Sequence, residues 1–215
     1  MRRALFLTLA LTFTLGARAV AQTCTGMPSF SAGQMQVTAG GSFADGASTF
    51  GGTFGYGAPK SFYGKAALGT TSYDAFDGSS VDFGVSGGYQ IALKSSRPVE
   101  VCPVASLSIG SGPDVNVFGT EVDMSSRTFA FGAALGAQLG NNPQLQIVPN
   151  ASFQFANDRF EIGDDAVSDG YGLLTLGTGF VFNSRYSLNP SISLPMGREI
   201  SDASFALAGA IHFGR

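Results

Sequence analysis

The residues of this 215-residue sequence that could do specific chemistry are few: its two cysteines, its single histidine, and three charged residues inside alternating segments. They are Cys24, Cys102, His212, Lys65, Asp82 and Glu100. Cysteines can pair as a disulfide in an oxidising compartment, and a histidine can serve a hydrolase as its base. Enclosed charges can form ion pairs or line a polar path. The elements that position these residues decide which chemistry is available.

The N-terminus has the organisation of a secretory signal peptide. Arg2 and Arg3 supply positive charge, residues 4–15 are apolar, and small residues over 17–21 offer cleavage sites. Because the apolar stretch is too short to span a bilayer comfortably, we expect residues 1–21 to be a cleaved leader and not an anchor. Its removal takes away three of the 12 basic residues, against 15 acidic ones, and so moves the formal net charge from −3 to −6. An acidic chain without a Lys/Arg cluster argues against a nucleic-acid partner.

The rest of the chain has the composition of strands. Charged residues make up only 13% of the sequence, which contains 30 glycines and 19 phenylalanines. Lys and Glu, which favour helices, are scarce, and no apolar run approaches the ~20 residues of a membrane-spanning helix. The composition therefore excludes a helical membrane protein.

Beyond residue 33, apolar and polar residues alternate with period two, as in strands with two different faces. Val81, Phe83 and Val85, for example, share one face, whereas Asp82 and Gly84 share the other. Ten segments follow this pattern, each close to the ~9–11 residues that a tilted strand needs to cross the hydrocarbon layer. They cover residues 34–43, 49–58, 61–71, 80–93, 99–110, 127–139, 145–156, 170–182, 187–196 and 203–213.

Two properties favour a transmembrane β-barrel over a soluble sandwich or a lipocalin-type barrel. The polar face consists of Gly, Ser, Ala, Thr, Gln and Asn with almost no charge, which suits a confined interior, while the Phe-rich face suits lipid. Connections at one end are short, as at 58–60 and 183–185, and the other end is predicted to carry long acidic loops at 111–126 and 157–169. We therefore predict an all-β, antiparallel up-and-down barrel over residues 34–213 with about ten strands. Eight strands with irregular ends are the alternative, and an even number places both termini in the periplasm.

The chain resembles the small outer-membrane β-barrel family of OmpA/OmpX-like proteins, through its leader, its alternating segments and its last strand. Members commonly end on a strand with a terminal aromatic residue that the insertion machinery recognises. Ile211 and Phe213 match this signal, although Gly214 and Arg215 follow the aromatic residue. The resemblance implies a location in the outer membrane, with outer-membrane lipid and lipopolysaccharide as neighbours. It also implies barrel-insertion machinery and periplasmic chaperones as partners.

Two features fit a barrel less easily. Pro103, Pro149 and Pro190 fall inside predicted strands and each removes a backbone donor, so bulges or register shifts are expected there. Trp is absent, so any aromatic girdle at the membrane interface must come from phenylalanines and tyrosines. The tyrosines expected in it are Tyr63, Tyr73, Tyr89, Tyr171 and Tyr186.

The predicted barrel places Cys24 just before the first strand and Cys102 near the start of the fifth, both at the periplasmic end. A disulfide is favoured over two unpaired thiols and over lipidation of Cys24, because the residues before Cys24 are a poor context for lipidation. Such a bond would tie residues 22–33, the predicted N-terminal periplasmic segment, across the opening as a partial plug.

His212 is also expected at the periplasmic end, where a structural histidine is favoured over a catalytic one because a lone histidine is a weak signal. Lys65, Asp82 and Glu100 are expected to face the lumen, where they either pack as ion pairs or line a narrow path. Packing is the favoured role. No metal site or cofactor is predicted, because the acidic residues of 157–169 are interpreted as a solvated loop.

These observations predict a non-enzymatic integral outer-membrane barrel that serves envelope structure, surface interaction or limited passage of small solutes. A narrow porin-like channel is the first alternative. A barrel-embedded lipid or peptide hydrolase that uses His212 is the second.

Overall fold

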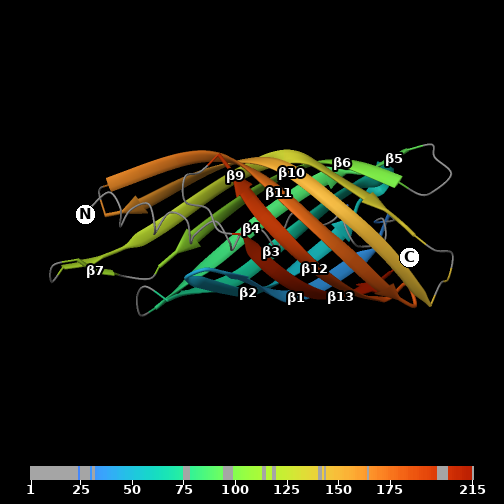
Figure 1. Cartoon of the computed structure of the whole chain (residues 1–215), viewed down its shortest axis with the longest axis horizontal. Helices are drawn as coiled ribbons and strands as arrows, with labels where there is room; N and C mark the ends of the chain where they lie inside the picture. The colour runs from blue at the N-terminus through green and yellow to red at the C-terminus, as the bar shows by residue number, and fades with distance from the viewer. Residues whose placement is uncertain are drawn as a thin grey trace.

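The computed structural model describes residues 24, 30, 32–74, 78–93, 99–112, 115–117, 120–139, 142, 144–163, 165–197 and 203–214. The predicted leader over 1–21 and most of the predicted N-terminal segment over 22–33 lie outside the described residues. Antiparallel strands wind obliquely around a common axis (Figure 1). Their bounds are β1 Met35–Ala44, β2 Ala47–Gly57, β3 Phe62–Tyr73, β4 Ser79–Tyr89, β5 Ile91–Leu93, β6 Val99–Ser111, β7 Val115–Val117, β8 Thr120–Val122, β9 Met124–Ala137, β10 Leu145–Ile162, β11 Asp165–Phe182, β12 Tyr186–Met196 and β13 Ser204–Phe213. A 3-10 turn, Pro59–Ser61, joins β2 to β3.

The strands close into a barrel. The sheet order is β4-β3-β2-β1-β13-β12-β11-β10-β9-β6-β5, and an additional pairing of β4 with β6 closes the sheet. Only Gln90 separates β4 from β5, and both pair with β6, so together they form one wall strand and the wall has ten. The prediction of ten strands is confirmed, and the eight-strand alternative is wrong. β1 pairs with β13 from Met35↔Phe213 to Phe43↔Phe205, so the start of β1 and the end of β13 share one end of the barrel. We call this the terminal end and the opposite end the loop end.

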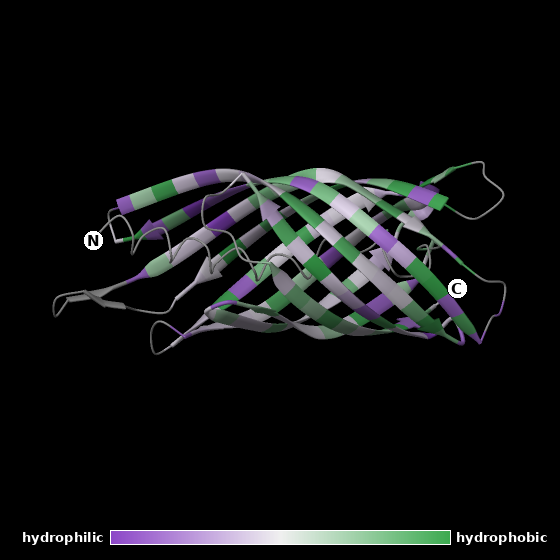
Figure 2. Cartoon of the chain, in the orientation of Figure 1, coloured by the Kyte–Doolittle hydropathy of each residue, from purple (hydrophilic) through white to green (hydrophobic). Residues whose placement is uncertain are grey.

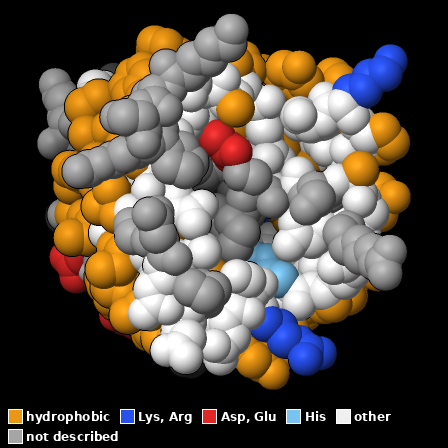
Figure 3. Space-filling model, turned by 90° about the vertical axis from the view of Figure 1, so that its right-hand side faces the viewer, with side chains coloured by type: hydrophobic (Ala, Val, Ile, Leu, Met, Phe, Trp, Pro, Cys, Tyr) orange, Lys and Arg blue, Asp and Glu red, His pale blue; other side chains and the backbone are white. Residues whose placement is uncertain are grey.

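Side chains alternate between the two faces of the wall, as the sequence predicts. Phe50 and Phe155 are each 54% exposed on the outside, whereas Gln36 and Asn189 are 0% exposed on the inside. Hydropathy therefore changes from residue to residue along the strands (Figure 2). Viewed onto the terminal end, hydrophobic side chains gather around the circumference (Figure 3). The wall is thus apolar outside and polar inside, the reverse of a soluble protein.

The loop end contains more strand than the sequence predicts. β10 and β11 pair without interruption from Leu145↔Phe182 to Ile162↔Asp165, so residues 157–169 are the tip of a hairpin and the predicted loop is wrong. Its acidic residues indicated a solvated loop, but beyond the hydrocarbon layer a strand can carry charge on either face. The other predicted loop, 111–126, contains the short β7–β8 hairpin.

The prolines predicted to disturb the wall, Pro103, Pro149 and Pro190, cause neither bulges nor register shifts, so that prediction is wrong. Each lies instead at a gap in the hydrogen-bond ladder on one side. Pro103 lies at the two-residue gap, opposite residues 89–90, between the β4–β6 and β5–β6 pairs. Pro149 lies between an isolated bridge and the β9 ladder, and Pro190 separates two runs of β11–β12 pairs. The register is the same before and after each gap, because the strand on the other side stays paired. The absence of a backbone N–H donor at each proline therefore removes a local hydrogen bond but leaves the wall in register.

The tyrosines divide differently from the prediction of a girdle. Three of the five expected there face the interior and are nearly inaccessible: Tyr63, Tyr73 and Tyr171. Tyr89 and Tyr186 face outward together with Tyr56, and all three lie at the terminal end. The position of each tyrosine in its strand determines its face, because successive side chains point alternately into and out of the barrel. Among the described residues, no helix is long and apolar enough to cross a membrane.

Candidate functional site at the terminal end of the barrel

A disulfide joins Cys24 to Cys102, as the sequence predicts. Cys102 lies on the inner face of β6 and is 0% exposed, and Cys24 is buried beside it. Their Cα atoms are 5.9 Å apart, within the usual range for this bond. Counted around the closed wall through β2, β3 and β4, β6 is the fourth strand from β1, into which the N-terminal segment leads. The bond therefore holds the start of the chain against the far side of the barrel interior.

Phe30 makes a second, non-covalent contact between the N-terminal segment and the wall. Its ring stacks on Tyr63 with 5.7 Å between the ring centroids, and its backbone N–H donates to Gln90 Oε1 at 3.1 Å. The ring fits because residue 55 is glycine: a Cβ at Gly55 would lie 2.9 Å from Phe30 Cζ. The Lys65 Nζ atom lies 6.0 Å from the centroid of the Phe30 ring, at the limit of a cation–π contact.

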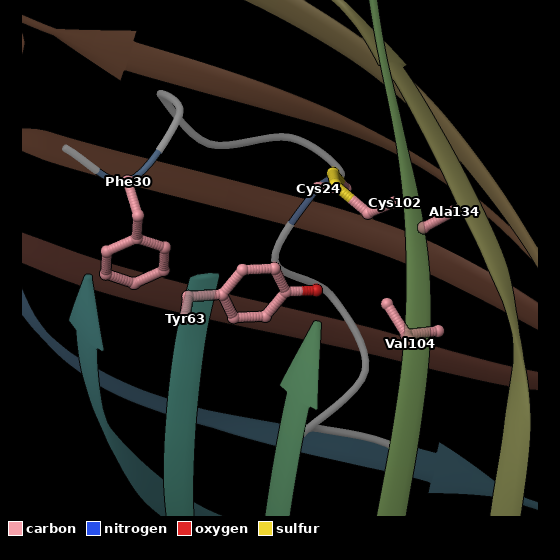
Figure 4. Close-up of a cluster of buried hydrophobic side chains, with 6 residues drawn as sticks. All are labelled: Cys24, Phe30, Tyr63, Cys102, Val104 and Ala134. Atoms are coloured by element: carbon pink, nitrogen blue, oxygen red, sulfur yellow. A yellow bond between two sulfur atoms is a disulfide. The ribbon is translucent and has the colours of Figure 1, made fainter. Parts of the chain in front are cut away.

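These residues form a buried group that we call the terminal cluster: Cys24, Phe30, Tyr63, Cys102, Val104 and Ala134 (Figure 4). Its members come from β3, β6 and β9 and from the chain before β1. An apolar group inside an otherwise polar barrel is stabilised by the same burial as a soluble core. The interior at this end is thus occupied by the chain itself.

The three charged residues predicted for the lumen do not come together. Lys65 and Asp82 are buried on the inner faces of β3 and β4, at 6% and 9% exposure, and Glu100 is half-buried on the same face of β6 as Cys102. Asp82 pairs with Gly69, four residues along β3 from Lys65, which corresponds to about 13 Å along the strand. Lys65 and Asp82 therefore form no ion pair with each other. Within the described part of the chain Lys65 makes no ion pair at all.

Asp82 instead accepts hydrogen bonds from hydroxyl groups. Thr71 donates to its Oδ2 atom at 3.0 Å and Ser80 at 3.4 Å. The network continues from Thr71 to Thr49 and from Ser80 to Tyr73, each at 3.0 Å between the oxygens. Neutral donors thus solvate this carboxylate in place of a cation.

His212 contacts a serine that the sequence did not single out. Its Nε2 atom lies 3.0 Å from Ser187 Oγ, and both side chains are about 5% exposed on the inner wall. This distance matches the one between the serine and the histidine of a hydrolytic triad. Within the described residues, no group of three or more His, Cys, Asp or Glu side chains is arranged to hold a metal ion.

Several site residues were missed from the sequence, although alternation contained the signal for some of them. Tyr63 and Tyr73 share the odd-numbered face of β3 with Lys65, which was predicted to face inward. Phe30 lies in a stretch without periodicity, so no pattern indicated its position. Ile211 and Phe213 lie in β13 as expected, with Ile211 exposed and Phe213 opposite Met35.

No family model and no curated protein matches the chain. Solved structures do match. The β domain of the Bordetella autotransporter BrkA has a TM-score of 0.56 at 14% identity, covering 84% of this chain and 99% of that one. The translocator domain of the autotransporter NalP from Neisseria meningitidis has a TM-score of 0.52 at 12% identity, covering 97% of both chains.

This chain has the fold of an outer-membrane β-barrel. A more distant likeness is Ail, the attachment invasion locus protein of Yersinia pestis, with a TM-score of 0.38 at 11% identity over 85% of this chain and 100% of that one. Identities this low concern the fold, so the role of this outer-membrane-type barrel has to be argued from its wall and its interior.

Proposed function

We propose that the protein is an integral outer-membrane barrel that serves envelope structure or surface interaction, allows at most limited passage of small solutes, and has no enzymatic activity. The observation that carries the proposal is the inverted wall, which exposes rings such as Phe50 and Phe155 and buries amides such as Gln36 and Asn189. Such an exterior is stable in hydrocarbon and not in water. A protein in that location would be exported by its leader and would be a client of periplasmic chaperones and of the barrel-insertion machinery.

Within outer-membrane barrels, we assign the chain to the small OmpA/OmpX-like kind. The single antiparallel wall, in which neighbouring strands follow one another in sequence, supports this assignment, although its ten strands exceed the about eight of OmpA/OmpX-type barrels. The last strand, β13, supports it further, because it ends on an aromatic residue at the terminal end, where Ile211 and Phe213 would be read during insertion.

The occupied interior supports a structural role over an open channel. Besides the terminal cluster, a second apolar group near the loop end consists of Ala47, Tyr73, Met124 and Phe160, all inaccessible to within a few per cent. A third joins Ala130, Ala156, Tyr171 and Leu173. Aromatic side chains at several levels of a ten-strand barrel leave little cross-section for solutes.

Two measurements on the refolded full chain test the proposal. The protein is expected to fractionate with membranes and to change its gel mobility on boiling, and planar bilayers are expected to show no large single-channel steps. Recovery in the soluble fraction without a heat-dependent shift would overturn the barrel itself. Large, reproducible steps in the oxidised protein would overturn the structural role.

The narrow-channel alternative has one observation in its favour: besides the main chain that leads into β1, the disulfide is the covalent link between Cys24 and the wall. If the N-terminal segment were a removable plug, a reductant would produce steps in wild type, and C24S/C102S would show them without it. Neutralising Lys65 or Asp82, both buried in the interior, would then change the conductance.

The hydrolase alternative rests on the contact between Ser187 and His212. It predicts lipid or peptide hydrolysis that both Ser187→Ala and His212→Ala abolish. Unchanged background rates in the two variants would end it, and we expect that result because both side chains are buried.

A further inference from the structure

Two arginines face outward side by side near the loop end. Lysine and arginine occur at only three positions in the described strands: Lys65, Arg127 and Arg159. Lys65 faces the interior, whereas Arg127 in β9 and Arg159 in β10 are exposed. In the register of β9 and β10 the two arginines are direct partners. The Cβ atoms of such partners lie about 4.5–5.5 Å apart, and like charges in this position are destabilising.

The charges around this pair compensate it only in part. Glu161, on the same face of β10, accepts from Arg159 Nε at 2.8 Å in an ion pair exposed to solvent. The remaining neighbours across the strands are uncharged: Ile109 and Ser168 lie opposite Arg127 and Arg159. Arg127 forms no ion pair with any residue that the structure describes. The patch therefore keeps an uncompensated positive charge that an anion could neutralise.

The outer surface next to the arginines, toward the terminal end, is aromatic. Phe129 follows Arg127 on the same face of β9, and its ring lies 5.9 Å from that of Phe131. Phe131 lies 5.9 Å from Phe155 of β10, which lies 5.1 Å from Phe153. The rings of Phe129, Phe131 and Phe155 are about half exposed. Two cations at the border of a contiguous apolar face match a molecule with anionic headgroup and hydrocarbon chains.

We propose that Arg127 and Arg159 bind the phosphate of a lipid headgroup, while Phe129, Phe131 and Phe155 contact its acyl chains. Guanidinium groups bind phosphate oxygens with paired N–H donors, and a phosphate between the two arginines removes their mutual repulsion. The inference rests on the proposed function, because it needs this face in lipid. The arginines lie three residues from the loop-end limits of β9 and β10, far from both termini. The ligand is therefore a phosphorylated glycolipid of the outer leaflet, the chemistry of lipopolysaccharide.

The test uses the full refolded chain in micelles of a neutral detergent, titrated calorimetrically with phosphorylated lipid A and, separately, with the dephosphorylated form. R127Q/R159Q is expected to weaken binding of phosphorylated lipid A about tenfold or more, since two charge-assisted contacts are lost. K60Q/R185Q is the matched control, because it removes the same charge from turns at the terminal end. It should change the affinity less than twofold. E161Q, which frees Arg159 from its carboxylate, should tighten binding a few-fold.

Equal affinity for the two lipid forms, or equal losses in the two double variants, would overturn the lipid site. Each variant is first checked for the heat-dependent gel shift. A wild-type protein without that shift would overturn the proposed function and the lipid site together. If the wild-type barrel is heat-modifiable but R127Q/R159Q leaves the affinity for lipid unchanged, the lipid site alone is overturned.

Discussion

The two ends of the barrel differ in how they are stabilised and in what they present. At the terminal end, tight turns join β2 to β3 and β11 to β12, three tyrosines face outward, and a disulfide and a stacked ring fill the interior. At the loop end, β10 and β11 continue as a charged hairpin, and hydroxyl groups surround the buried Asp82. The terminal end thus contains the contacts that hold the N-terminal segment in place, whereas the loop end presents charged residues on its surface. If this comparison is right, substitutions at the terminal end should cost far more stability.

Removing the disulfide should have the largest effect. C24S/C102S is expected to lower the free energy of unfolding by about 4 kcal/mol, because the bond closes a long loop in the unfolded chain. The two cysteines are 78 residues apart in the sequence, which sets the length of this loop. Urea unfolding in micelles, followed by gel mobility, measures the change. Adding reductant should lower the wild type to the level of C24S/C102S and leave that variant where it was.

Truncating Phe30 should cost somewhat less, about 2–3 kcal/mol, since one buried ring and its stacking on Tyr63 are lost. Gly55→Ala should also destabilise, because its methyl group would press on the Phe30 ring. A double-mutant cycle joins the two: in the Phe30→Ala background, Gly55→Ala should become nearly neutral. Additive effects would mean that Phe30 does not occupy this position.

At the loop end, Asp82→Ala should cost only about 1–2 kcal/mol, because it leaves the Thr71 and Ser80 hydroxyls without their acceptor. Asp82→Asn keeps an acceptor oxygen and should cost less. Asp74→Asn, in the exposed turn after β3, is the matched control and should be neutral to within about 0.5 kcal/mol. The same unfolding assay applies. A loss for Asp82→Ala equal to that of the disulfide variant would erase the difference between the ends.

The smallest effect is expected at the outer ion pair. Glu161→Gln should change the free energy of unfolding by less than about 0.5 kcal/mol, because the pair with Arg159 is solvent-exposed. The same variant should raise the affinity for phosphorylated lipid A. A marked loss of stability would show that Glu161 supports the hairpin itself.

The same division explains what the sequence could predict. Ten wall strands followed from alternation, because one buried face makes every second residue informative. The disulfide followed from two cysteines at one end of the barrel and a predicted oxidising compartment. The contact between Phe30 and Tyr63 could not be predicted, since residues 22–33 carry no period and their path depends on tertiary packing.

Contacts that depend on register were also beyond the sequence. Arg127 and Arg159 are 32 positions apart, and only the pairing of β9 with β10 makes them neighbours. The same holds for Lys65 and Asp82, which the register keeps apart. The hairpin at 157–169 was missed because charge indicated a loop, whereas the alternation of its inward residues, Asp158 and Phe160, continued.

The position of the disulfide also has a consequence for biogenesis. The wall closes only when β1 meets β13, the last strand to be made, yet the bond from Cys24 to Cys102 needs no residue beyond β6. On the export route that we propose, the chain can therefore be oxidised while its second half is still crossing the inner membrane. The barrel would then close around an N-terminal segment that is already bonded to β6. This segment is therefore enclosed during assembly and does not have to enter a finished pore.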